Sequence, residues 1–176
     1  ADVGRQKLAD MVRWRERCGT GTSQEKDVTL EEVLTMRERR AALQREMLLG
    51  GESLISFTLN VPGGVKRFPA EDRAFDEAVA LIRCRKEKAG FRILREEQTE
   101  QRAGQEAFFL LNAPAEAVKR LTLVIEETHP LGRFFDIDVL YKTGQHLDRE
   151  DFDRPPRRCY LCGGDARNFG RSRAHG

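Results

Sequence analysis

The spacing of apolar residues predicts a regular succession of helices and strands between Thr29 and Tyr141. Apolar residues that recur every three or four positions indicate helices, whereas short runs of β-branched and aromatic residues indicate strands. By this criterion helices begin at Thr29, near Glu71 and at Pro114, and strands occupy residues 54–61, 91–95, 107–111 and 134–141. After the first helix the expected order is therefore β-α-β-β-α-β.

The ends of the expected helices carry local signals. Thr29 and Glu32 form the capping-box pattern that starts a helix. The last helix ends at His129-Pro130, because a residue that precedes proline is pushed out of helical space. The apolar positions expected to face the core are Val33, Met36, Leu43, Met47, Phe75, Val79, Ile82, Val118, Leu121 and Ile125.

This order of elements is typical of a ferredoxin-like α+β sandwich, in which helices cover one face of an antiparallel sheet. We expect an extra N-terminal helix and, after Leu147, a loop-rich basic C-terminal extension with a short strand near residues 158–161. Residues 1–27 are polar and charged and read as a flexible or weakly helical arm. Residues 28–176 then form a single domain.

Composition narrows the class of protein. The chain has 176 residues and a net charge of +2, which gives no reason to expect a nucleic acid partner, although the segment after Arg154 is strongly basic. No apolar run is long enough to span a membrane. Two scattered cysteines, Cys18 and Cys84, and one Cys159-x-x-Cys162 pair favour a reducing cytoplasm over a secreted disulfide scaffold. The chain starts without Met and stops just after His175, so we expect a fragment or trimmed form.

Asp136 and Asp138 are the strongest candidate site residues. They lie two positions apart in an apolar strand, so an extended backbone places both carboxylates on one face. Paired acids repel each other and lose solvation, and a divalent cation removes that cost. The pair therefore predicts a Mg²⁺ site that handles phosphates. The structural alternative is a strand end whose acids form ion pairs with Arg133 or with arginines of the C-terminal segment.

Three further residues have both a structural and a functional explanation. His129 follows a helix and is either a capping histidine or a general base. Arg133 offers a planar guanidinium to phosphate. Lys66 lies in a Gly-containing loop that either binds an anion or is an ordinary turn.

Cys159, Cys162 and His175 match the first three ligands of a Cys-Cys-His-His zinc site, but the fourth ligand is missing. A structural Zn²⁺ ion is therefore the less favoured explanation, and a pair of reduced thiols is the alternative. A thioredoxin-like role is disfavoured further, because the pair does not open a helix.

Taken together, several motifs resemble the citrate lyase holo-acyl-carrier-protein synthase family, also called apo-citrate lyase phosphoribosyl-dephospho-CoA transferase. The resemblance runs from about Val28 to His175 and excludes residues 1–27. The motifs are Leu59-Asn-Val-Pro-Gly-Gly-Val-Lys66, His129-Pro-Leu-Gly-Arg-Phe-Phe-Asp-Ile-Asp-Val139, Pro155-Pro-Arg-Arg-Cys-Tyr-Leu-Cys162 and Arg171-Ser-Arg-Ala-His175. Related sequences tend to carry a further Cys where this chain has Phe169, which weakens the zinc prediction, and they continue beyond the histidine.

The resemblance implies a nucleotidyltransferase. Its donor is 2′-(5″-triphosphoribosyl)-3′-dephospho-CoA, its acceptor is a serine of the apo acyl-carrier subunit of citrate lyase, and diphosphate is released. For this reaction we expect Asp136 and Asp138 to bind Mg²⁺. Arg133 would lie beside the ion and help to neutralise the charge on the phosphate oxygens. His129 would accept the serine proton. The predicted substrate-binding residues are Lys66, Arg157 and Arg158.

Two other classes of function stay open at this point. A non-catalytic accessory protein of the lyase complex would use the basic segment to dock an acidic carrier protein. A ferredoxin-like RNA-binding module would stack bases on Phe108, Phe109, Phe134 and Phe135. The acidic pair and the absence of the RNA-binding aromatic motif disfavour the second class.

Overall fold

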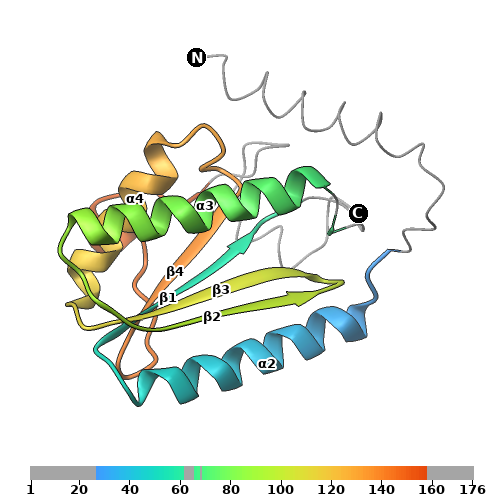
Figure 1. Ribbon diagram of the computed structural model, residues 1–176, viewed down its shortest axis with the longest axis horizontal. Helices are drawn as coiled ribbons and strands as arrows, with labels where there is room; N and C mark the ends of the chain where they lie inside the picture. Colours follow the sequence, from blue (N-terminus) through green and yellow to red (C-terminus); the bar gives the residue numbers. More distant parts are fainter. Residues whose placement is uncertain (1–26, 62–65, 68, 158–176) are drawn as a thin grey trace.

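The computed structural model describes residues 27–61, 66–67 and 69–157 (Figure 1). The elements are α2 (Leu30–Leu48), β1 (Ser53–Leu59), α3 (Pro69–Lys88), β2 (Ile93–Gln101), β3 (Gly104–Leu111), α4 (Ala115–Thr128), β4 (Phe135–Tyr141) and the short 3-10 helix η1 (Glu150–Phe152). The predicted β-α-β-β-α-β order after the first helix is confirmed. The predicted N-terminal arm, apart from Asp27, and the predicted strand at 158–161 lie outside the described residues.

Helix α2 begins as its sequence predicts. The Thr29 side chain accepts a hydrogen bond from the backbone N–H of Glu32, and the Glu32 carboxylate accepts one from the N–H of Thr29. This reciprocal pair satisfies two backbone donors that a helix start leaves unbonded.

The four strands form one antiparallel sheet in the order β2-β3-β1-β4. Among the described strands, β4 therefore lies at an edge of the sheet and has β1 as its one neighbour. In this register Ser56 lies opposite Asp138, and Thr58 lies opposite Asp136. Directly opposite residues in an antiparallel pair project their side chains from the same face of the sheet. The side chains of Ser56 and Thr58 are therefore the neighbours of Asp138 and Asp136 on β1.

Helices cover both faces of the sheet, which corrects the expectation of helices on one face only. Helices α3 and α4 lie on one face, and α2 runs along the other (Figure 1). Residues 53–57 of β1 are all buried, because both faces of this central strand are covered. A strand with one exposed face would alternate between buried and exposed positions. The weak alternation of β1 therefore reflects the cover that α2 adds on the second face.

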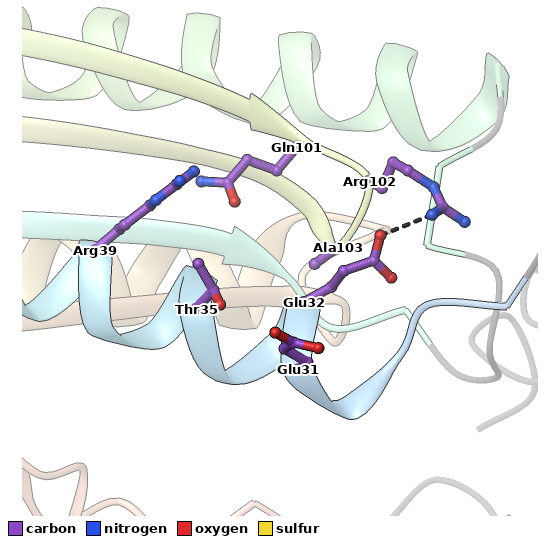
Figure 2. A pocket seen from close by; sticks show the side chains of 7 residues that line it. All are labelled: Glu31, Glu32, Thr35, Arg39, Gln101, Arg102 and Ala103. Atoms are coloured by element: carbon purple, nitrogen blue, oxygen red, sulfur yellow. Dashed lines mark hydrogen bonds and ion pairs between the residues drawn. The ribbon is translucent and has the colours of Figure 1, made fainter.

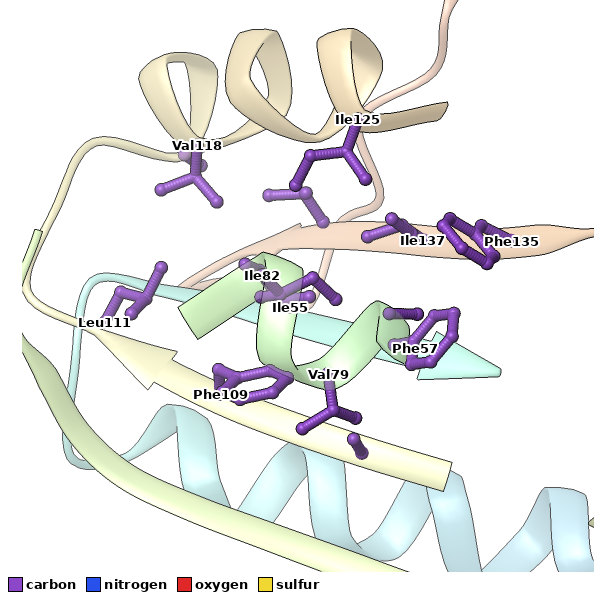
Figure 3. Close-up of a cluster of buried hydrophobic side chains, with 14 of the residues drawn as sticks. Ile55, Phe57, Val79, Ile82, Phe109, Leu111, Val118, Ile125, Phe135 and Ile137 are labelled. Atoms are coloured by element: carbon purple, nitrogen blue, oxygen red, sulfur yellow. The ribbon is translucent and has the colours of Figure 1, made fainter. Parts of the chain in front are cut away.

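The main core lies between the sheet and helices α3 and α4 (Figure 3). It contains the predicted apolar stripes of both helices. Figure 3 labels Val79 and Ile82 of α3, Val118 and Ile125 of α4, and the sheet residues Ile55, Phe57, Phe109, Leu111, Phe135 and Ile137.

Strand β2 is longer than predicted. The sequence favoured a strand at 91–95 followed by a polar connection, whereas β2 continues to Gln101 and turns directly into β3. Its residues are largely polar and half-buried because β2 is the other edge of the sheet. Backbone pairing with β3 holds this segment in place, and apolar periodicity does not report backbone pairing.

The turn between α4 and β4 passes very close to the last turn of α4. A Cβ atom added at Gly132 would lie 2.0 Å from the carbonyl oxygen of Glu126. Backbone hydrogen bonds from Gly132 to His129 and from Phe135 to Gly132 fix the turn. Glycine is therefore required here by space, and this close approach sets where β4 begins.

We expect Gly132→Ala to lower the free energy of unfolding by about 1–3 kcal/mol, because the added methyl group forces the turn away from α4. Gly50→Ala is the matched control, since its added Cβ would meet nothing closer than 3.4 Å. Urea unfolding of both variants measures the difference. Equal stability of the two variants would show that the turn accommodates a side chain.

Candidate functional site

Asp136 and Asp138 lie on one face of β4, as their spacing predicted, and this face is turned toward α2. The buried residues between and beside them, Phe135 and Ile137, face α3 and α4. Asp136 is exposed, and the side chain of Asp138 is 45% exposed. Solvent and ligands can therefore reach both carboxylates.

The surroundings shift the pKa values of the two aspartates in opposite directions. Although Asp136 is accessible, the surrounding protein reduces the solvation of its carboxylate, and this effect and the negative charge of Asp138 raise its pKa, whereas the positive charge of Arg157 opposes the shift. Burial also acts to raise the pKa of Asp138, but the neighbouring His146 outweighs it and lowers the pKa. Asp138 thus carries the more stable negative charge of the two.

His146 is a neighbour of the acidic pair that the sequence did not reveal. A turn at Gly144 brings the chain back along β4, and His146 forms a bridge with Leu140. Its Nδ1 lies 3.9 Å from Oδ1 of Asp138. The neighbouring carboxylate of Asp138 raises the pKa of His146 above its usual value. In the sequence, Gly144 soon after the strand is the only sign that the chain turns back toward β4 here.

Two side chains of α4 form hydrogen bonds with the backbone of β4 at the edge that faces away from β1. The N–H of Ile137 donates to Oε1 of Glu126 at 3.3 Å, and Nζ of Lys119 donates to the carbonyl oxygen of Ile137 at 3.4 Å. Both side chains are buried, and burial lowers the pKa of Lys119 against the opposing charges of Glu126 and Asp138. A buried ammonium group therefore lies beside the acidic pair.

Arginines of the segment after β4 converge on the end of α4. Arg149 Nη1 lies 2.5 Å from Oε2 of Glu126, and Arg157 Nη2 lies 2.7 Å from its Oε1. Arg149 and Arg154 also pair with Glu127, each at 3.1 Å. These ion pairs hold the segment against the β4 edge and place the charge of Arg157 near Asp136. Arg158 lies outside the described residues.

The structure does not bring His129 to the acidic pair. Its ring stacks on Phe135 with the centroids 4.9 Å apart, on the side of the sheet that α3 and α4 cover. Its Nδ1 accepts a hydrogen bond from the N–H of Leu131, and its Nε2 lies 3.1 Å from Glu77 of α3. These contacts stabilise the turn after α4, and a catalytic role for His129 stays a prediction.

Arg133 and Lys66 lie in loops at the end of the sheet where β4 begins. Arg133 is exposed in the turn before β4. Nζ of Lys66 donates to the carbonyl oxygen of Val61 at 2.6 Å, just beyond the end of β1. The end of β1 is joined to the start of β4 by a hydrogen bond from Asn60 to Phe134. The phosphate-binding roles of both cations stay predictions.

Arg67, the residue after Lys66, forms ion pairs with three carboxylates. It reaches Asp72 at 2.6 Å, Glu100 at 2.9 Å and the buried Glu71 at 3.3 Å. Burial raises the pKa of Glu71 to about 7, although the charge of Arg67 opposes this shift. This network fastens the start of α3 to the end of β2.

Metal ligands do not gather into larger clusters in the part of the chain that the structure describes. No group of three or more His, Cys, Asp or Glu side chains with metal-binding geometry occurs there. The predicted zinc ligands Cys159, Cys162 and His175 lie outside the described residues. Two aspartates remain, which is a number of protein ligands that Mg²⁺ commonly uses together with substrate phosphates.

A separate cavity of about 380 Å³ lies between α2 and the β2–β3 hairpin (Figure 2). Its lining residues are Glu31, Glu32, Thr35, Arg39, Gln101, Arg102 and Ala103, and an ion pair between Arg102 and Glu32 crosses it. This hairpin belongs to the edge of the sheet opposite β4. The cavity therefore does not contain the acidic pair.

The RNA-binding alternative lacks its surface. All four phenylalanines that it requires are buried, with Phe108, Phe109 and Phe135 fully inaccessible. Bases cannot stack on rings that other side chains cover.

No helix in the described ranges is long and apolar enough to cross a membrane.

Comparison with known proteins gives a consistent result. The family described as apo-citrate lyase phosphoribosyl-dephospho-CoA transferase matches residues 28–176. Proteins of that name from Escherichia coli O9:H4 (strain HS) and Shigella boydii serotype 18 (strain CDC 3083-94 / BS512) are each 36% identical to this chain over 149 residues. The matched region covers 84% of this chain and 81% of each relative.

The raised pKa of Glu71 predicts a pH-dependent stability. Because the folded pKa of about 7 exceeds the ordinary value of 4.5, ionisation favours unfolding as the pH rises between these values. Glu71→Gln cannot ionise, so its stability relative to wild type should increase by on the order of 2–3 kcal/mol from pH 4.5 to pH 8. Urea unfolding across this range measures the change. A difference that stays constant with pH would contradict the prediction.

Proposed function

Because the chain belongs to the apo-citrate lyase phosphoribosyl-dephospho-CoA transferase family, we propose that it attaches the phosphoribosyl-dephospho-CoA group to apo-citrate lyase. The donor is 2′-(5″-triphosphoribosyl)-3′-dephospho-CoA, and the acceptor is a serine hydroxyl of the apo acyl-carrier subunit. The serine oxygen forms a bond to the α-phosphorus, the bond from that phosphorus to the diphosphate breaks, and the serine proton is released.

The observation that carries this proposal is the acidic pair on an accessible face with cations around it. Asp136 and Asp138 are open to solvent, and the charges of Lys119 and Arg157 act on them from the β4 edge. Transfer at a phosphorus atom places negative charge on the attacking, bridging and leaving oxygens. A site that combines acids and fixed cations suits that charge distribution.

The acidic pair fits Mg²⁺ by its chemistry. Burial and mutual repulsion raise the pKa of Asp136, and a cation held by both carboxylates would remove this repulsion. Asp136 and Asp138 would hold the ion, and when bound it would neutralise charge on the donor phosphates. Phosphate oxygens of the donor and water would supply the remaining ligands.

The cations along the β4 edge suit the triphosphate and the departing diphosphate. Arg157 is anchored by Glu126, so its guanidinium is held near Asp136 before any ligand arrives. Lys119 is held by the backbone of Ile137 and supplies a second fixed charge. Positive groups that need no rearrangement stabilise a developing charge at low cost. Arg133, Lys66 and Arg158 are proposed as further phosphate contacts.

We infer that residues 28–157 include a ferredoxin-like sandwich to which α2 adds a third layer. The alternative function within the same family relationship is a non-catalytic accessory protein of the lyase complex, in which the basic segment docks an acidic carrier. This alternative requires no phosphate chemistry at the acidic pair, so an assay of covalent transfer separates the two functions.

Covalent transfer can be followed by mass spectrometry of apo acyl-carrier protein incubated with the donor, Mg²⁺ and the full chain. We expect wild type to add one prosthetic group per carrier. Asp136→Asn and Asp138→Asn should each lower the rate by at least about 100-fold, because the charge that holds the cation is lost.

Asp76→Asn is the matched control, since Asp76 is an exposed aspartate on α3, across the sheet from the acidic pair. Its rate should equal that of wild type. An unmodified carrier with active donor and folded wild-type protein would support the accessory alternative. Full activity in either Asp136→Asn or Asp138→Asn would remove that carboxylate from the site.

Arg157 and Arg154 offer a matched pair in the segment after β4. Both form ion pairs with the end of α4, but Arg157 pairs with buried Glu126, whereas Arg154 pairs with Glu127 at the surface. We expect Arg157→Gln to raise KM for the donor about tenfold or more, because one charged hydrogen bond to phosphate is lost. Arg154→Gln should change KM little. Equal effects of the two changes would indicate that both arginines only hold the segment in place.

A further inference from the structure

Helix α2 contacts the sheet through two chemically different halves. Toward its C-terminal end, Met47 and Leu48 pack on an apolar patch of the sheet. The sheet residues of this patch are Leu54, Phe108, Leu110 and Leu140. One to two turns earlier, Gln44 and Arg40 bond to polar side chains of the sheet instead. The acidic pair lies on this same face of the sheet, so the polar half of α2 is a part of its surroundings.

A row of polar residues crosses the whole sheet beneath this half of α2. Asp136 lies opposite Thr58, Thr58 opposite Glu106, and Glu106 opposite Thr99. All four side chains project toward α2, because opposite residues in antiparallel strands share a face. Adjacent strands are about 4.8 Å apart, which places Glu106 roughly 10 Å from Asp136. Arg40 lies over this row.

Glu106 holds the Arg40 side chain in place. The Glu106 side chain is only 2% exposed, its Oε1 is ion-paired with Nε of Arg40, and its Oε2 accepts a hydrogen bond from Thr99. The Arg40 side chain is 26% exposed. In the residues that the structure describes, 27–61, 66–67 and 69–157, the hydrogen bonds of Arg40 use its Nε and neither of its Nη groups. A buried carboxylate thus fixes a guanidinium whose two Nη groups have no partner among these residues.

The neighbouring contact fixes how α2 lies on β1, the strand next to the acidic pair. Nε2 of Gln44 donates to Oγ of Ser56 at 3.0 Å, and Ser56 lies directly opposite Asp138. The charge of Arg40 acts on both Asp136 and Asp138, although Arg40 belongs to a different layer of the molecule. Arg40 therefore faces the acidic pair from the α2 side, opposite to the cations of the β4 edge.

We propose that Arg40 binds the phosphates of the donor, with α2 forming the second wall of the active site. This proposal rests on the proposed function, because the donor is an organic triphosphate. The Nη groups of Arg40 can make two parallel hydrogen bonds to phosphate oxygens, which a lysine at this position cannot do. Glu106 acts as a positioning residue, since it holds Arg40 through Nε and not through the Nη groups.

Removal of Arg40 alone would leave the buried carboxylate of Glu106 without its ion-pair partner. A single variant would therefore not separate weaker ligand binding from lower protein stability. The double variant Arg40→Met/Glu106→Gln avoids the unpaired charge, and Arg40→Lys keeps a positive partner for Glu106. Arg45→Gln, which changes an exposed arginine of the same helix, is the control for loss of charge. Urea unfolding checks that each variant is folded.

The binding probe is inorganic triphosphate with Mg²⁺, measured by calorimetry on the full chain without carrier protein. We expect Arg40→Lys and the double variant to bind it at least tenfold more weakly than wild type, and Arg45→Gln to bind it like wild type. In the transfer assay the first two variants should show a correspondingly higher KM for the donor. The double variant should be more stable than Arg40→Met alone.

A purely structural role predicts a different outcome. In that case the double variant, once folded, would bind triphosphate and transfer the group like wild type, and this result would overturn the proposal. The binding measurement does not depend on transfer to the carrier. Weaker triphosphate binding by the Arg40 variants of a chain that transfers nothing would therefore reject the proposed function and support the role of Arg40.

Discussion

The carboxylate of Glu126 is the contact on which the candidate site most depends. It accepts the N–H of Ile137 and pairs with Arg149 and Arg157. One buried side chain thereby joins α4, the edge of β4 and the segment that follows β4. Since an isolated buried carboxylate is strongly unfavourable, these partners constrain one another. The position of the acidic pair relative to its cations follows from this single group.

The two faces of the sheet differ in the side chains that they carry and in what those side chains do. The face toward α3 and α4 is almost wholly apolar and supplies the main core. The face toward α2 is apolar only at one end, and its other end carries the polar row that includes Asp136 and Glu106. Because strand side chains alternate between faces, one short strand can serve both tasks. In β4 the core residues Phe135 and Ile137 alternate with the two aspartates.

Sequence patterns predicted the parts of this structure that depend on local periodicity. The helix starts, the order of helices and strands along the chain and the shared face of Asp136 and Asp138 follow from spacings of two, three or four residues. The patterns could not show that α2 covers the second face, because an apolar stripe does not specify its partner. Arg40 lies in a run of charges typical of a solvated surface, and Lys119 reads as an ordinary polar position of α4. Their roles arise only from tertiary contacts.

The completed edge of β4 also limits how another protein can approach. An exposed strand edge is a template for pairing with a strand of a partner, and charged or covering groups prevent this. Here the backbone groups of Ile137 are already bonded to Lys119 and Glu126. A carrier protein therefore cannot extend the sheet at this edge without breaking both contacts. Under the proposed function, a carrier would therefore present its serine to the acidic face without adding a strand to this edge.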